Sequence, residues 1–178
     1  MDFYPTGFGI TFAKGTTQED LLTRMGGDPA SARMAGLDDA DDWEQEDLDS
    51  GPVLRFGESH EWSFALENYG SLSLSIAGKI SKGIKIVALS RLENAISRMV
   101  HAVDQQVLLD VDVSMLSALA APPEGGLLSE IIDYSNSTSP GLGYMTAREM
   151  LRFAHKRFGL EVERDLIAGE LLSCRIDL

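Results

Sequence analysis

Eight carboxylates and one indole lie within twelve consecutive residues, DDADDWEQEDLD at 38–49, and no lysine or arginine interrupts them. Side chains of this kind can bind a divalent cation, attract a basic protein or keep a loop solvated. A helix–loop–helix calcium site needs a glycine at its sixth position and a glutamate at its twelfth. Counted from Asp38, these positions hold Trp43 and Asp49, so we expect no metal site.

The acidic run also concentrates the charge of the chain. The net charge is −13, of which the run supplies −8, so the remaining residues carry −5. Phosphate contacts require a basic face, which disfavours binding to nucleic acid or to an anionic membrane surface. A basic protein partner is favoured, because opposite charges accelerate association.

Trp43 separates two interpretations of the run. Blocks of like charge usually repel and form a mobile, solvated loop. Protein interfaces, in contrast, favour a tryptophan anchor surrounded by charge, although the indole could equally pack into the domain's own core. The docking hypothesis assigns partner binding to Asp38, Asp39, Asp41, Asp42, Trp43, Glu44, Glu46, Asp47 and Asp49.

The remaining candidates for catalysis are few. His60 lies between Glu58 and Glu61 and could act as an acid or base with a raised pKa, but an exposed histidine at a strand edge is the simpler interpretation. Cys174 is the single cysteine, and we expect a buried structural thiol. The sequence has no phosphate-binding glycine loop and no nucleophile elbow. We therefore expect no catalytic residues, no cofactor and no enzymatic activity.

The elements that position these residues are predicted from hydrophobic periodicity. Alternating or β-branched segments indicate strands at 7–15, 60–70, 84–91, 94–104 and 106–113, the last two joined by a turn at 104–106. Helices are predicted over 16–27 and 145–160. Thr16 or Thr17 is the expected N-cap of the first, with Thr16 and Glu19 as a capping box, and Thr146 forms a capping box with Glu149 in the second. Residues 71–83 fit either a strand or a short helix.

The order of these elements predicts one α+β domain over residues 1–178. We expect a mainly antiparallel sheet of five to six strands, with an N-terminal helix and C-terminal helices packed on it. Residues 28–58 would form an irregular acidic insertion and 127–178 a helical C-terminal part. No apolar run approaches the ~20 residues of a membrane span and the start lacks a secretory leader, so we expect a cytoplasmic location.

Three segments carry a resemblance: GFGITFAKGTTQEDLLTRMGGDP, EWSFALENYG and MTAREMLRFAHKRFGLEVE. They resemble an uncharacterised actinobacterial domain family with a WxFALE strand motif, from which the acidic segment departs. That family has no assigned activity, so no catalytic residues carry over. The size and acidity of the chain also resemble those of bacterial toxin-immunity proteins. This implies an immunity- or antitoxin-like protein that blocks a basic toxin or effector. The alternatives are a structural or regulatory subunit of a bacterial assembly and a small-molecule enzyme that uses His60.

Overall fold

The computed structural model describes residues 7–68, 70, 72–92, 96–119 and 125–177, so the first six residues, on which the expectation about a leader depends, lie outside it. The strands are β1 (Phe8–Lys14), β2 (Arg33–Ala35), β3 (Val53–Ser59), β4 (Trp62–Glu67), β5 (Lys85–Arg91), β6 (Ser97–Val103), β7 (Gln106–Asp112) and β8 (Leu171–Arg175). The helices are α1 (Gln18–Arg24), α2 (Leu37–Glu46), α3 (Leu72–Ile80), α4 (Leu127–Thr138), α5 (Ala147–Phe158) and α6 (Arg164–Ala168), with 3-10 turns η1 (Leu48–Ser50) and η2 (Val113–Ala118).

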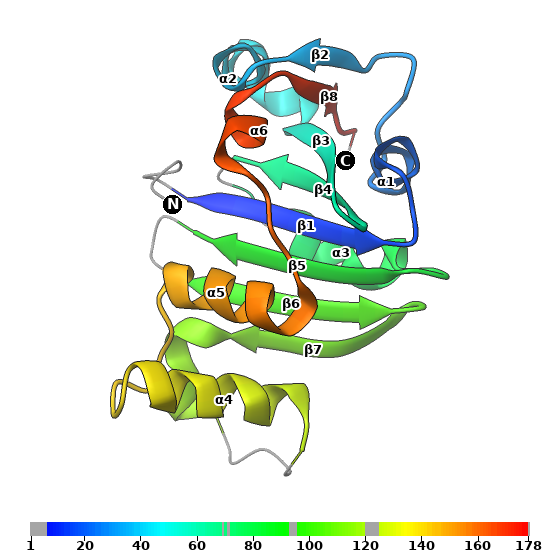
Figure 1. Ribbon diagram of the computed structural model, residues 1–178. Helices are drawn as coiled ribbons and strands as arrows, with labels where there is room; N and C mark the ends of the chain where they lie inside the picture. The colour runs from blue at the N-terminus through cyan, green and yellow to red at the C-terminus, as the bar shows by residue number, and fades with distance from the viewer. Residues whose placement is uncertain (1–6, 69, 71, 93–95, 120–124, 178) are drawn as a thin grey trace.

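The eight strands of the described residues form one antiparallel sheet in the order β2-β8-β3-β4-β1-β5-β6-β7 (Figure 1). The α+β class and the antiparallel pairing confirm the sequence-based expectation. The number of strands does not, since the sequence predicts only five to six.

The sheet is covered on both faces, as alternation along its central strands requires. Ile10 and Phe12 of β1 pair with Leu66 and Phe64 of β4, and all four side chains enter one core. Helices α4, α5 and α6 complete that core, while α1 and α3 cover the opposite face. Figure 1 shows α5 in front of the sheet and α3 behind it.

The predicted capping box of α5 is present. Thr146 accepts a hydrogen bond from the Glu149 amide, and the Glu149 carboxylate accepts one from the Thr146 amide. Gly159 then ends the helix in the left-handed conformation at φ +71°. For α1 the expected box is wrong, because Thr17 caps the helix by accepting from the Asp20 amide, while the Thr16 hydroxyl donates to the Asp20 side chain.

The segment 28–58 is not the irregular insertion that the sequence predicts, because it contains β2, α2, η1 and β3. Strand β3 lies between β4 and β8, and its residues from Val53 to Gly57 are all buried, so no polar alternation marks it. Strand β2 has only three residues and pairs with β8 at the edge of the sheet.

The structure decides between the two alternatives for residues 71–83. Residues 72–80 form α3, with Leu74, Ala77 and Ile80 buried at helical spacing. The C-terminal part is mainly helical, as expected, and ends in strand β8 within the sheet. None of the helices in the described part of the chain has the length and apolar character needed to cross a bilayer.

Candidate functional site: the acidic helix α2

The acidic run forms an ordered helix, α2, which ends before Asp47. Gly36 precedes it, and Asp38 and Asp39 lie in its first turn, where the helix dipole favours negative charge. No basic residue lies in its last turn. The helix packs through Ala40 and Trp43 against a small apolar cluster that includes Ala35 of β2 and Val53 of β3. Repulsion among its acidic side chains destabilises α2, and the packing of Ala40 and Trp43 compensates for this.

Trp43 faces its own protein. The Arg33 guanidinium lies over the indole with its Cζ 4.0 Å from the ring centroid, and that of Arg175 lies 5.9 Å away. Arg175 also donates hydrogen bonds to the carbonyl of Trp43, to that of Asp47 at 2.6 Å and to that of Gly51 at 2.9 Å. The bond to Trp43 satisfies one carbonyl in the last turn of α2, and the bond to Asp47 satisfies that of its C-cap residue. The indole thus anchors α2 to the sheet, and its position does not support the role of partner anchor.

Two of the acids, Asp41 and Glu44, also point inward. The Asn68 amide donates to the Asp41 carboxylate, but burial raises the pKa of Asp41. Burial, followed by repulsion from Asp41, raises the pKa of Glu44 to about 7. The Glu44 Oε2 atom is buried and has no hydrogen-bond partner among the described residues. These two acids are unsuited to an outward-facing docking site.

The six other acids form an exposed acidic face: Asp38, Asp39, Asp42 and Glu46 on α2, with Asp47 and Asp49 just after it. Asp38, Asp42 and Glu46 are spaced four residues apart, so they lie along one side of the helix. None of the six forms an ion pair with any residue that the structure describes. Their charge is therefore directed to solvent.

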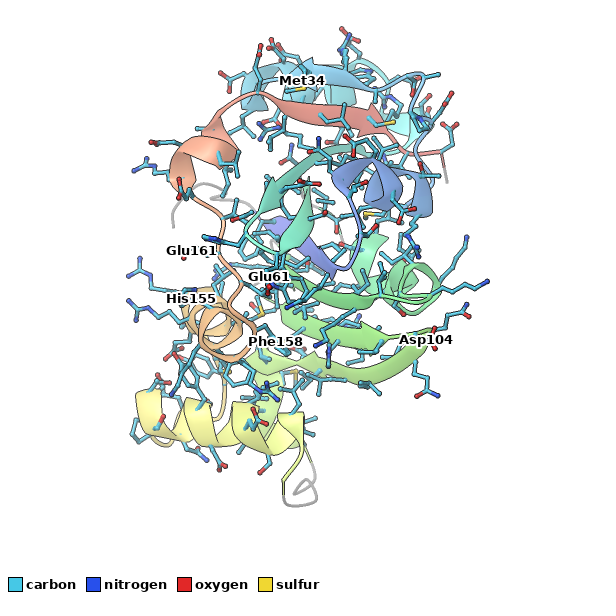
Figure 2. All side chains as sticks on the ribbon, turned by 45° about the vertical axis from the view of Figure 1, so that its right-hand side comes forward. Met34, Glu61, Asp104, His155, Phe158 and Glu161 are labelled. Atoms are coloured by element: carbon cyan, nitrogen blue, oxygen red, sulfur yellow. The ribbon has the colours of Figure 1, made fainter. Side chains whose placement is uncertain are left out.

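A groove of about 410 Å³ separates this face from the edge strand β2. The groove is lined by Arg33, Met34, Ala35, Asp39, Asp42, Trp43 and Glu46. Met34 is 58% exposed, and Figure 2 places it at the end of the molecule opposite α4. Carboxylates, an exposed thioether and an open strand edge therefore adjoin one another. Within the described chain, no His, Cys, Asp and Glu side chains converge as a metal site would require.

The geometry at His60 offers little to an enzyme. His60 is exposed in the β3–β4 turn at φ +55°, where water cannot be excluded from a substrate. Glu58 accepts from the Gln18 amide at 3.2 Å, and Glu61 pairs with Lys14 at 2.6 Å. The hydrogen bond from Lys14 lowers the pKa of Glu61. Both neighbouring acids are thus engaged elsewhere, and Cys174 is a buried, free thiol as expected.

Sequence reasoning missed two buried charged residues near α2. Arg55 on β3 is 2% exposed and donates to the carbonyls of Ile167 at 2.9 Å and Gly169 at 2.6 Å, which holds α6 to the sheet. Glu67 accepts from the amides of Leu72 at 3.1 Å and Ser73 at 3.3 Å and so caps α3, although burial raises its pKa. A charged residue inside an apolar strand, as in VLRFG and FALEN, is the signal that could have found both.

Comparison of the chain with models of known protein families, with curated proteins and with solved structures gave no match. The resemblance to an actinobacterial family stays a prediction, and inferences about function rest on the geometry of the molecule.

Proposed function

We propose that this chain is a protein-binding module that docks a basic protein through the exposed acidic face of α2. The observation that carries the proposal is the set of six exposed carboxylates on and after α2, none of which forms an ion pair with a described residue. A fold gains nothing from such a concentration of like charge, because carboxylates four residues apart repel each other.

The mechanism would be electrostatic attraction followed by occlusion. Opposite charges steer two proteins together and raise the association rate more than the affinity. A basic surface that normally contacts phosphates would accept carboxylates in their place. This is the way in which an immunity- or antitoxin-like protein would block a nuclease-type toxin, and the helical order of α2 would reduce the entropy cost of binding.

The test compares two variants with equal changes in charge. The first neutralises the face with Asp38→Asn, Asp39→Asn, Asp42→Asn and Glu46→Gln. The control changes four exposed acids elsewhere: Glu19→Gln, Asp133→Asn, Glu163→Gln and Asp165→Asn. A partner would be captured from the native host with the unaltered protein and purified, and its association rate with each variant measured at low and physiological salt.

We expect the neutralised face to slow association at least about tenfold at low salt, with little effect of the control. The unaltered protein should lose a similar factor between low and physiological salt. A partner that associates equally fast with all three proteins, whatever the salt, would show that the acidic face has no part in docking.

One observation favours a structural or regulatory subunit of an assembly as the second candidate. The edge strand β7 exposes Val107 at 52% and Leu108 at 58%, and an edge with apolar side chains can receive a strand from another chain. In that case Leu108→Lys would abolish partner binding, while the neutralised face would leave it intact.

A further inference from the structure

A second site, separate from the acidic face, lies where the chain reverses after α5. Gly159 turns the backbone, and residues 160–162 run back across the sheet toward α6, as Figure 1 shows. The His155 ring nitrogen Nδ1 lies 3.3 Å from the carbonyl oxygen of Leu160, a contact that joins the helix to the returning segment. Helix α5 and this segment form the walls of a cleft of about 590 Å³ over β1 and β5. That volume lies in the range of small-molecule sites.

The inside of the cleft is apolar. Its floor consists of Ile10 and Phe12 from β1 and Leu89 from β5, and its walls include Leu151 and Val162. The lining of α5 extends from Arg148 to His155, which at 1.5 Å per residue is roughly 10 Å. Ile10, Phe12 and Leu89 are themselves almost fully buried, so an apolar chain or ring system of about that length would displace water mainly from the half-buried Leu151.

Exposed charged side chains lie at the mouth of the cleft. Arg148 and Arg152 lie one helical turn apart on α5, and both line the cleft with Glu161. Arg152 is exposed and forms no hydrogen bond or ion pair with a described residue. Glu161 lies 4.0 Å from His155, and Figure 2 shows both on one flank of α5. Arg152 thus presents an unpaired guanidinium beside the cleft, in a chain of net charge −13.

We propose that this cleft binds a small amphipathic monoanion, a carboxylate attached to an apolar body. The carboxylate accepts hydrogen bonds from the guanidinium groups of Arg148 and Arg152, whose fork geometry matches its two oxygens. The apolar body lies against Leu151, above the buried floor of Phe12 and Leu89. Glu161 disfavours a dianion, because a second negative charge at the mouth would meet its carboxylate. This inference does not depend on the proposed docking function of α2.

The experiment is a titration of the full chain with sodium decanoate, followed through the backbone amide resonances of the ¹⁵N-labelled protein. We expect saturable one-to-one binding, with shifts confined to β1, β5, α5 and residues 159–162. Arg152→Glu should weaken binding about tenfold or more, because it removes a charge-assisted hydrogen bond and adds a repulsion. The matched control Lys82→Glu, the same charge change at an exposed residue outside the cleft, should stay within about twofold of the unaltered affinity.

Two further measurements test separately what the carboxylate and the apolar chain of decanoate contribute to binding. Decanol has the same chain without the charge and should bind at least about tenfold more weakly than decanoate. Leu151→Trp should fill the cleft and abolish decanoate binding, while its amide spectrum shows that the fold is retained. Shifts that do not saturate, equal affinities for decanol and decanoate, or equal losses in Arg152→Glu and Lys82→Glu would each overturn the proposal.

Discussion

The guanidinium of Arg33 covers the indole ring of Trp43, with the Arg33 Cζ 4.0 Å from the ring centroid. This contact joins the edge strand β2 to helix α2. A cation over an aromatic face is a favourable electrostatic contact that needs no carboxylate. The most acidic helix of the protein is therefore fixed by a cation that leaves its exposed acids unpaired.

Loss of the Trp43 side chain should destabilise the protein. We expect Trp43→Ala to lower the free energy of unfolding by about 2–3 kcal/mol, less than for a fully buried tryptophan, because the ring is only partly buried. Arg33→Ala should cost about 0.5–1 kcal/mol. Urea unfolding measures both, with Trp43→Phe as the control that keeps an aromatic face. Equal stability of the alanine variant and the unaltered protein would contradict the packing role.

The raised pKa of Glu44 predicts a pH dependence. Its pKa is about 7 in the folded protein, against 4.5 as the ordinary value. The folded state therefore binds more protons than the unfolded state between these values, so stability falls as pH rises from 4.5 to about 7. Glu44→Gln should remove this fall and raise the free energy of unfolding at pH 8 by on the order of 1 kcal/mol, a figure reduced for the partial exposure of the carboxyl.

The measurement is urea unfolding of both proteins at pH 5 and pH 8. Glu46→Gln, which removes the same charge at an exposed acid of the same helix, is the control against which the effect of Glu44→Gln is compared. An effect of Glu44→Gln that is equal at the two pH values would mean that the carboxyl does not titrate in this window.

The exposed acidic face should reduce the stability of the protein. Asp38 and Asp42, and likewise Asp42 and Glu46, are four residues apart on α2, so each pair repels by a few tenths of a kcal/mol. Asp42→Asn removes both repulsions and should raise the melting temperature at low salt. The gain should shrink at high salt, where charges are screened. Calorimetry at two salt concentrations checks this, and a lower melting temperature would show that Asp42 makes a favourable contact.

Gly9 is required by a neighbouring side chain. A Cβ at this position would overlap the Cγ of Glu67, its partner on β4. Gly9→Ala should therefore push Glu67 from the start of α3 and lower the free energy of unfolding by about 1–3 kcal/mol. In a double-mutant cycle by urea unfolding, Gly9→Ala should cost much less in a Glu67→Ala background. Additive costs would show that the two residues do not interact.

The parts of the fold that the sequence predicts are those with a clear alternation or a cap. β1 and β4 alternate large apolar residues with small ones, although both of their faces are buried, and α5 has its capping box and its terminal glycine. The sequence does not predict β3, because VLRFGES shows no such alternation: Val53 and Leu54 are adjacent, and a buried arginine, Arg55, follows them. A three-residue edge strand such as β2 has too few residues to show any period.

The candidate site was only partly predictable for a related reason. The inward side of α2 consists of Leu37, Ala40, Asp41, Trp43 and Glu44, which recur at helical spacing. Two of these five residues are acids, so the inward side is hidden in a uniformly charged sequence. Which carboxylates face solvent becomes clear only when the tertiary contacts of Trp43 fix the rotation of the helix.

Strand β8 pairs with β3 on one side and with β2 on the other. More than a hundred residues separate the end of β3 at Ser59 from the start of β8 at Leu171, so β8 is synthesised long after the two strands that it joins. Until β8 has been synthesised, β2 lacks its strand partner, and the backbone groups of β3 on the side of β8 remain unpaired. Such distant pairing is slow, and it gives chaperones a defined interval in which to shield the nascent chain from aggregation.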